Sequence, residues 1–276
     1  MPPSVPKNTK MSSQSPPPNV VATTRKLSIS SGVRKIAQKI ILYGPGAVGK
    51  TTLASCLDDV GIMPLFVDIE EGSSQLDVAR IDPTPETFEE MREAIQLAAN
   101  SPDIGAIVID SFTKAEELAT AYTLRTIKHE KGEPITGIES YGWGKGYVHV
   151  YESFLLLLQS LDAAARKGKH IIGICHDVTE KVPNPNGEDW LQYQPRLQSP
   201  PKNGKTRERV REWSDHLLFV GFDAYVDKDG KAKGGGSRTI YTTARPMYWA
   251  KSRSLSESVV YEQGDAEIWK QLFKKE

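Results

Sequence analysis

The sequence predicts an α/β fold, in which a mostly parallel sheet is flanked by helices and extended by antiparallel strands on its C-terminal side. Three observations predict it. Short apolar runs alternate with helical stretches, the first apolar run ends directly at a Gly-rich loop, and strand-like segments dominate late in the chain. Strands that alternate with helices are typical of a parallel sheet covered by helices, and the later strands indicate an antiparallel extension.

The first elements come directly after residue 39. Ile40–Tyr43 is a short apolar run typical of a buried parallel strand. A helix is expected from Thr51 to about Val60. Met63–Asp68 is the second predicted strand, with its proline near the start, where a strand tolerates it.

The remaining elements continue the alternation. The next predicted helix has Thr84 as its N-cap and Pro85 at its first position, and extends to about residue 99. Helices are also expected over about 114–129 and 147–166, and strands over 104–110, 170–176, 190–197, 215–222 and 238–243. A Gly-rich segment over 131–145 and a polar segment over 177–189 are predicted as loops.

Residues 1–35 are predicted to be a disordered leader, and residues 36–276 a single domain. The leader is rich in Pro and Ser, so it cannot bury enough apolar surface to offset the entropy of ordering. Residues 1–39 hold seven Lys and Arg and no acid. This basic composition would suit an organellar transit peptide, but the prolines oppose the amphipathic helix that such a peptide needs.

The overall composition excludes several classes of protein. The 276 residues carry no formal net charge, so no strong global field indicates a nucleic-acid or membrane partner. Two cysteines, Cys56 and Cys175, are too few for a disulfide scaffold and fit a reducing compartment. The longest apolar run, Phe154–Leu158, is far shorter than a membrane helix. We therefore expect a soluble cytoplasmic protein with no membrane partner.

A phosphate-binding loop follows the first strand. It fits G-x-x-x-x-G-K-[ST] and consists of Gly44, Pro45, Gly46, Ala47, Val48, Gly49, Lys50, Thr51 and Thr52. Glycines let backbone N–H groups converge on phosphates, and the following helix presents its N-terminus to them. Lys50 would reach the β- and γ-phosphates, and the Thr51 hydroxyl would hold Mg²⁺. The strand before the motif and the helix after it favour this interpretation over a chance Gly-rich turn.

Asp110 is the predicted second metal residue. It ends the apolar run Ile107–Asp110, where a carboxylate would lie beside the phosphate loop and near the metal. The alternative is that Asp110 caps the following helix, a role that Ser111 could also fill.

Three acids follow the second strand, which we expect to neighbour the first: Asp68, Glu70 and Glu71. Hydrolysis of a nucleoside triphosphate needs a base or an orienting group for the attacking water. Glu70 and Glu71 are both candidates from their spacing. A solvated acidic turn is the alternative.

The order of these motifs resembles RecA-type ATPase cores. A phosphate loop is followed by Asp-x-Glu after the second strand and then by the run Ile107–Ser111. The resemblance implies that Glu70 is the catalytic glutamate. It also implies that His176, or alternatively Asp177, senses the γ-phosphate and connects it to a DNA-binding loop. The residue at that position in RecA is a glutamine, so the histidine is a departure.

A closer resemblance is to phage-encoded RecA-like ATP-binding proteins, which are proposed to anneal or recombine single strands. It covers roughly residues 38–255 and includes the segments Tyr141–Tyr147, Ile171–His176 and Ala250–Arg253. The resemblance implies ATP and Mg²⁺ as cofactors, ATP in preference to GTP, single-stranded DNA as a partner, and a homo-oligomeric ring or filament in the host cytoplasm.

Two loops and a basic region are the predicted DNA contacts. The resemblance places the loops at 131–146 and 177–189, the first of which contains Tyr141 and Trp143. Aromatic faces stack on bases, although these two rings could instead pack over the following helix. Residues 196–211 carry six basic residues and one acid, which would track phosphates or simply form a solvated loop and helix.

Lys251 and Arg253 match, by the same resemblance, basic residues that reach the ATP of a neighbouring protomer. A cation in that position stabilises the charge of the transition state. A surface turn with two solvated cations is the alternative.

Two other functional classes remain open. A small-molecule or nucleotide kinase uses the same loop, but it would need an Arg-rich lid, which 196–211 could imitate, and the Asp-x-Glu motif opposes it. A nucleotide-dependent loader or annealing protein would bind ATP with negligible turnover.

Overall fold

The computed structural model describes residues 28–29, 31–32, 36–226 and 232–273. The chain divides into two units, Met1–Lys35 and Ile36–Glu276. The predicted disordered leader, residues 1–35, lies almost entirely outside the described residues. The fold below is therefore that of the second unit.

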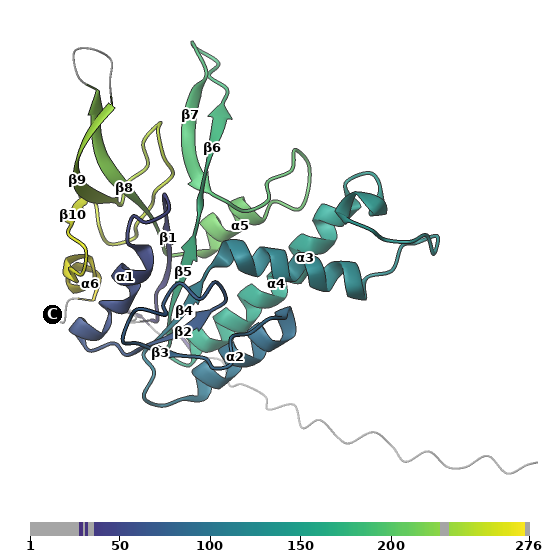
Figure 1. Ribbon diagram of the computed structural model, residues 1–276, viewed down its shortest axis with the longest axis horizontal. Coiled ribbons are helices and arrows are strands. Elements are labelled where there is room, and N and C mark those ends of the chain that lie inside the picture. The colour runs from purple at the N-terminus through teal and green to yellow at the C-terminus, as the bar shows by residue number, and fades with distance from the viewer. Residues whose placement is uncertain (1–27, 30, 33–35, 227–231, 274–276) are drawn as a thin grey trace, which may run out of the picture. The chain divides into compact units, whose positions relative to one another are not determined.

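An eight-stranded sheet organises this unit, in the order β10-β9-β8-β1-β5-β4-β2-β3 (Figure 1). The strands from β8 to β3 pair in parallel, whereas β9 pairs in antiparallel fashion with both β8 and β10. This confirms the predicted α/β fold with an antiparallel extension. The bounds are β1 Lys39–Tyr43, β2 Pro64–Asp68, β3 Ala79–Arg80, β4 Ala106–Asp110, β5 His170–Cys175, β8 His216–Val226, β9 Ala232–Tyr241 and β10 Val259–Tyr261.

The helices cover both faces of the sheet. Side chains alternate along β1, so Ile41 and Tyr43 pack with α2, α3 and α4, while Ile40 and Leu42 pack with α1 and α6. Burial on both faces explains why β1 reads as a continuous apolar run. The helices are α1 Lys50–Ser55, α2 Phe88–Asn100, α3 Phe112–Thr126, α4 Lys145–Arg166, α5 Thr206–Trp213 and α6 Glu267–Leu272, with 3₁₀ turns at Asp58–Val60 and Ile138–Tyr141.

The position of the second strand differs from the prediction. We expected β2 to neighbour β1, but β4 and β5 lie between them. The chain crosses from β1 to β2 and fills the gap only later, when β4 and then β5 enter the sheet. The carboxyl ends of β1, β5, β4 and β2 nevertheless meet at one edge, so residues that follow these strands still lie close together.

The first part of the segment predicted as a polar loop, 177–189, is a strand. β6, Asp177–Val182, pairs in antiparallel fashion with β7, Trp190–Pro195, to form a separate two-stranded sheet. β6 contains Val178, Thr179 and Val182 together with three charged residues, and none of its residues is buried, which suits a strand with both faces partly solvated. Only residues 183–189 remain as the connection, and Pro183 ends the strand.

Three helix boundaries also differ. α1 is shorter than predicted, because it ends at Ser55 and a 3₁₀ turn replaces its last turn. α2 begins after Thr87 rather than Thr84, because the Thr87 and Glu90 side chains form a reciprocal capping box. α3 begins at Phe112, and the Ser111 hydroxyl accepts a bond from the Lys114 N–H as its cap.

The C-terminal elements β10 and α6 were not predicted at all, nor were the two-residue β3 and helix α5. β10 is three residues long and α6 six, so both are shorter than the stretches over which a strand or helix periodicity can be recognised. No helix among the described residues has both the length and the apolar character that a membrane span requires.

Candidate nucleotide site

The phosphate loop connects the carboxyl end of β1 to α1, and its glycines are there for steric reasons. Gly44 has a φ of 152°, and a Cβ on it would lie 2.0 Å from the Val220 carbonyl oxygen of β8. Gly49, immediately before α1, has a φ of 94° in the left-handed region. The loop can therefore pass β8 and turn into the helix only with glycine at these positions.

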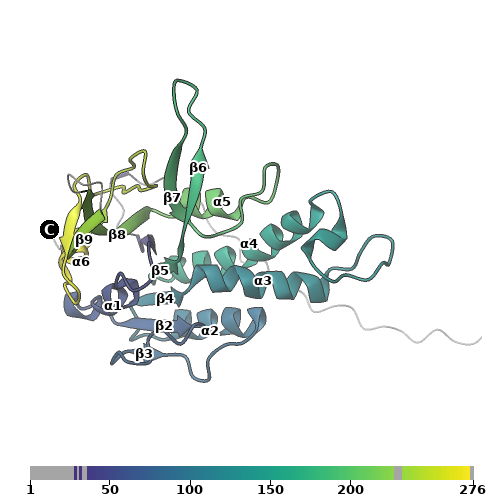
Figure 2. The same ribbon diagram turned by 45° about the horizontal axis from the view of Figure 1, so that its top comes forward.

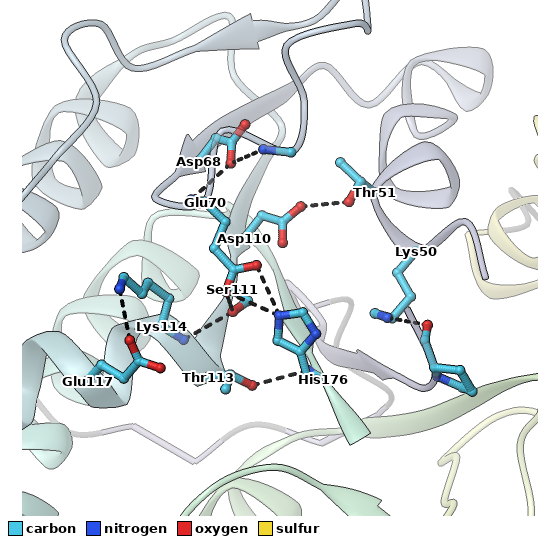
Figure 3. A network of polar contacts seen from close by, with 12 residues as sticks. Lys50, Thr51, Asp68, Glu70, Asp110, Ser111, Thr113, Lys114, Glu117 and His176 are labelled. Atoms are coloured by element: carbon cyan, nitrogen blue, oxygen red, sulfur yellow. Dashed lines mark hydrogen bonds and ion pairs between the residues drawn. The ribbon is translucent and has the colours of Figure 1, made fainter. Parts of the chain in front are cut away.

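Lys50 lies inside the loop. Its Nζ donates to the carbonyl oxygens of Gly44 and Pro45, at 2.7 and 2.8 Å (Figure 3). The side chain is buried, and burial lowers the pKa of its ammonium group. A buried cation that contacts only neutral carbonyls is well suited to an anionic ligand, because phosphate oxygens would supply the compensating charge.

Thr51 and Asp110 meet at the carboxyl end of the sheet. The Thr51 hydroxyl donates to Asp110 Oδ2 at 2.7 Å. Burial raises the pKa of the Asp110 carboxyl to about 6. Mg²⁺ is usually held by one or two protein oxygens together with waters and nucleotide phosphates. This donor pair fits that mode of binding, and the described residues contain no cluster of three or more His, Cys, Asp or Glu that would form an all-protein cage.

Glu70 lies between two partners from neighbouring strand ends. Ser111 Oγ donates to Glu70 Oε1 at 2.6 Å, and His176 Nε2 lies 3.0 Å from Glu70 Oε2. The hydrogen bond with His176 lowers the pKa of the Glu70 carboxyl, as does the one from Ser111. Figure 3 shows this carboxylate beside Asp110 and Thr51. Glu70 is thus an ionised base held by two neutral or cationic donors.

Asp68 has a different role from Glu70. Its buried carboxylate accepts bonds from the backbone N–H groups of Gly72 and Ser73 and from the Ser73 hydroxyl. These bonds fix the turn that follows β2. The turn directs Glu70 toward Ser111 and His176, whereas the Glu71 side chain bonds neither of them. The geometry therefore distinguishes two glutamates that the sequence spacing leaves equivalent.

His176 connects this network to the β6–β7 hairpin. Its backbone N–H donates to Thr113 Oγ1 at 3.1 Å, and its ring contacts Glu70. Asp177, the alternative sensor, is the first residue of β6 and pairs with Pro195. The roles of Thr113 and of Ser111 as a donor to Glu70 were not predicted, although a hydroxyl directly after Asp110 is present in the motif.

Comparison with known proteins agrees with this geometry. A family model described as an AAA domain matches residues 36–254. The chain belongs to the AAA domain family. It is therefore a nucleotide-binding protein with a P-loop NTPase fold. A search of curated proteins finds no match to the chain.

Lys251 and Arg253 lie at the other end of the AAA domain's sheet. The backbone of Lys251 pairs with Leu217 near the start of β8, and Arg253 Nε lies 3.2 Å from Asp215 Oδ1. The Asp215 N–H in turn donates to the Lys39 carbonyl at the start of β1. The structure therefore does not bring these two cations to the phosphate loop of the same chain.

The two aromatic residues of segment 131–146 have opposite environments in the AAA domain. Tyr141 is 5% exposed, and its hydroxyl donates to the Ile127 carbonyl at 2.7 Å. Trp143 is 100% exposed and has a φ of 51°, between two glycines with positive φ. Tyr141 is thus a packing residue, whereas the Trp143 ring is available to a ligand.

The basic segment 196–211 is not a uniform cationic surface. Arg207 is buried, and its Nη1 donates to Glu180 of β6 at 3.0 Å and to Gln194 of β7 at 2.8 Å. This arginine ties α5 of the AAA domain to the hairpin and cannot also contact DNA phosphates. At least one of the six basic residues in this segment is therefore structural.

Proposed function

We propose that this protein is a Mg²⁺-dependent ATPase that acts on single-stranded DNA in strand annealing or recombination. One observation carries the proposal. The Glu70 carboxylate lies at the carboxyl end of the sheet, bonded to Ser111 and His176, with the Thr51–Asp110 pair beside it. A base next to a metal-binding pair and a phosphate loop is the arrangement that triphosphate hydrolysis requires.

The position of each residue in the site indicates its role. The backbone N–H groups of residues 44–52 and Lys50 would bind the phosphates, while Thr51 and Asp110 would hold Mg²⁺. When bound, the metal offsets negative charge on the phosphate oxygens. Glu70 would accept a proton from the attacking water or orient it, because it is the ionised carboxylate of the site.

The link from Glu70 to the hairpin supports coupling between nucleotide and DNA. His176 contacts Glu70 with its ring and is followed directly by β6. A change of hydrogen-bond partner at Glu70 would therefore move the start of β6. Figures 1 and 2 show the β6–β7 hairpin extending away from the helices that cover the sheet.

Exposed aromatic and apolar side chains support a single-stranded partner. Trp143 is fully exposed, and Leu191 on the β6–β7 hairpin is 65% exposed. Exposed aromatic faces stack on unpaired bases, which are buried inside a duplex. The resemblance to phage RecA-like proteins is the source of the annealing and recombination role.

We further propose that Lys251 and Arg253 act in trans in a homo-oligomer. Both lie at the amino end of the sheet, far from their own phosphate loop, and the Arg253 side chain is 67% exposed. An exposed arginine at one end of a molecule whose nucleotide site is at the other end suits head-to-tail assembly.

The experiment that tests the proposal is ATP hydrolysis by the purified protein with and without single-stranded DNA, at two salt concentrations. We expect stimulation by DNA that weakens as salt rises, because phosphate contacts release counterions. Trp143→Ala should weaken DNA binding about fivefold or more, since stacking contributes roughly 1–3 kcal/mol per base. Tyr141→Phe is the matched control. Hydrolysis that is indifferent to DNA would remove the DNA role and leave the ATPase.

A further inference from the structure

The chain beyond the matched AAA domain contributes to the phosphate loop. The family model ends at residue 254, whereas β10 and α6 follow it. β10 extends the sheet by pairing with β9, through Val259 and Ile240 among others. This places two large side chains of the C-terminal segment, Tyr261 and Trp269, against the loop and its helix.

Tyr261 contacts the residue that ends the loop. Its hydroxyl donates to the Gly49 carbonyl oxygen at 2.9 Å. The tyrosine is 3% exposed, and burial raises its pKa to about 12, so the hydroxyl is a donor at neutral pH. The same carbonyl accepts the Leu53 N–H at 2.8 Å, the first bond of α1. Both lone pairs of the Gly49 carbonyl are therefore used.

The orientation of this carbonyl matters for anion binding. The peptide between Gly49 and Lys50 is planar, so fixing its carbonyl also fixes the direction of the Lys50 N–H. Gly49 lies in the left-handed region, where glycine has wide freedom to rotate. A hydrogen bond from Tyr261 restricts that freedom before any phosphate binds.

Trp269 makes the equivalent contact at the other end of α1. Its indole N–H donates to the Leu53 carbonyl oxygen at 2.6 Å, and the side chain is fully buried. α1 has only six residues, so it cannot be stable without tertiary contacts, and its last carbonyls need partners outside the helix. Trp269 supplies one of them.

We propose that Tyr261 and Trp269 form a C-terminal clamp, which holds the phosphate loop and α1 in their anion-binding geometry, with Tyr261 as a positioning residue. The clamp acts on the main chain of the loop and not on the nucleobase. It rests on triphosphate binding by the loop, and it requires neither hydrolysis nor DNA.

The test is a binding measurement on the full chain with three probes: MgATP, MgGTP and magnesium tripolyphosphate, which has no base. Tyr261→Phe keeps the ring and removes only the hydroxyl. We expect its Kd to rise about two- to tenfold for every probe that the wild type binds, which corresponds to one net hydrogen bond. Where ATP turns over, KM should rise and kcat should stay near the wild-type value, because the loop binds ground and transition states alike.

Two further variants separate positioning from stability. Tyr141→Phe removes a buried hydroxyl that also bonds a main-chain carbonyl, but on the far side of the domain. It should leave all the binding constants unchanged, even if thermal unfolding shifts as in Tyr261→Phe. Trp269→Phe keeps an aromatic ring, removes the indole donor to Leu53, and should raise the Kd in the same direction as Tyr261→Phe.

Three outcomes would overturn the clamp. Equal constants for the wild type and Tyr261→Phe would refute the clamp alone. A loss confined to MgATP or MgGTP, with tripolyphosphate unaffected, would assign Tyr261 to the nucleobase instead. No tripolyphosphate or nucleotide binding by the wild type would refute the nucleotide site, and the clamp with it.

Discussion

The two ends of the parallel strands carry their charges in opposite arrangements. At the carboxyl end, Asp110 accepts a hydrogen bond from the Thr51 hydroxyl, and the Lys50 ammonium group donates to backbone carbonyls. Neither side chain is therefore hydrogen-bonded to a group of opposite charge. At the amino end, cations contact carboxylates directly, as Arg253 does with Asp215 and Lys39 with Asp162 at 3.2 Å. At the carboxyl end, Lys50 and Asp110 are therefore held by neutral groups, whereas at the amino end these cations and carboxylates pair with one another.

This difference shows which end is prepared for a ligand. A carboxylate and an ammonium group, both buried and held by neutral partners, keep their charge available to a metal ion and a phosphate. The Arg253 side chain is 67% exposed and can contact a second molecule, while the buried Asp215 carboxylate also accepts the Lys39 N–H. The carboxyl end thus suits catalysis, and the amino end suits contact with another molecule.

The largest expected difference between the two ends of the sheet is in ATP turnover when one lysine is removed from each end. Lys50→Ala should abolish ATP turnover, because the loop loses the cation that meets the transferred phosphate. Lys39→Ala, at the amino end, should keep turnover. Steady-state ATP hydrolysis measures both, and undiminished turnover by Lys50→Ala would refute the assigned site.

Arg253→Ala tests whether the amino end of one chain serves the carboxyl end of another. We expect turnover to fall about a thousandfold, as when an arginine finger is lost, with the fold intact. Mixing this variant with Lys50→Ala should restore part of the activity, because a mixed pair joins an intact Arg253 to an intact loop. Absence of recovery in the mixture would exclude action in trans.

Glu70→Gln sharpens the assignment within the carboxyl end. The amide keeps the shape of the side chain but cannot accept a proton, so kcat should fall about a hundredfold while nucleotide still binds. Glu71→Gln is the matched control, because the Glu71 side chain does not bond Ser111 or His176, as Glu70 does. Single-turnover hydrolysis and nucleotide binding give the two readouts, and equal effects of the two changes would contradict the distinction.

The smallest effect is expected on stability at the amino end. Burial lowers the pKa of His216 to about 4, despite the nearby Asp215. Arg253 and Lys251, which face it, act in the same direction as burial, and Ser252 and Gln38 bond the ring nitrogens. The neutral ring therefore makes its full contribution to stability at pH values above about 6.5, the pKa of histidine in the unfolded state. This contribution is lost as the pH falls toward 4.

Urea unfolding of the wild type and His216→Gln at several pH values measures this contribution. The free energy of unfolding of the wild type should fall more steeply than that of the variant between about pH 6.5 and 4. The difference in slope should correspond to at most one proton taken up on unfolding. Parallel curves for the two proteins would contradict the buried, neutral histidine.

The sequence predicted the elements whose information is local. β1 is an apolar run that leads into the phosphate loop, and β4 is an apolar run that ends in Asp110. Both strands occur where expected. The antiparallel extension was also predicted, although its last strand was not. Contacts between distant residues could not be inferred in the same way.

Most of the features that were not predicted depend on contacts between residues far apart in the sequence. Nothing in the run Pro64–Asp68 indicates that β4 and β5 will separate β2 from β1, because both strands come later in the chain. β6 was mistaken for a loop because it contains only two apolar residues, Val178 and Val182, so the period-2 signal is weak. Tyr261 had no signal, since its partner Gly49 is 212 residues away.

The order of strands in the sheet has a consequence for biosynthesis. β1 leaves the ribosome well before either of its neighbours in the sheet, since Ile41 lies opposite Gly173 on one side and Leu217 on the other. Gly49 meets Tyr261 only after another 212 residues have been added. At about 5–20 residues per second this takes on the order of tens of seconds. A nascent chain therefore carries its phosphate loop long before Tyr261 can hold the Gly49 carbonyl in place.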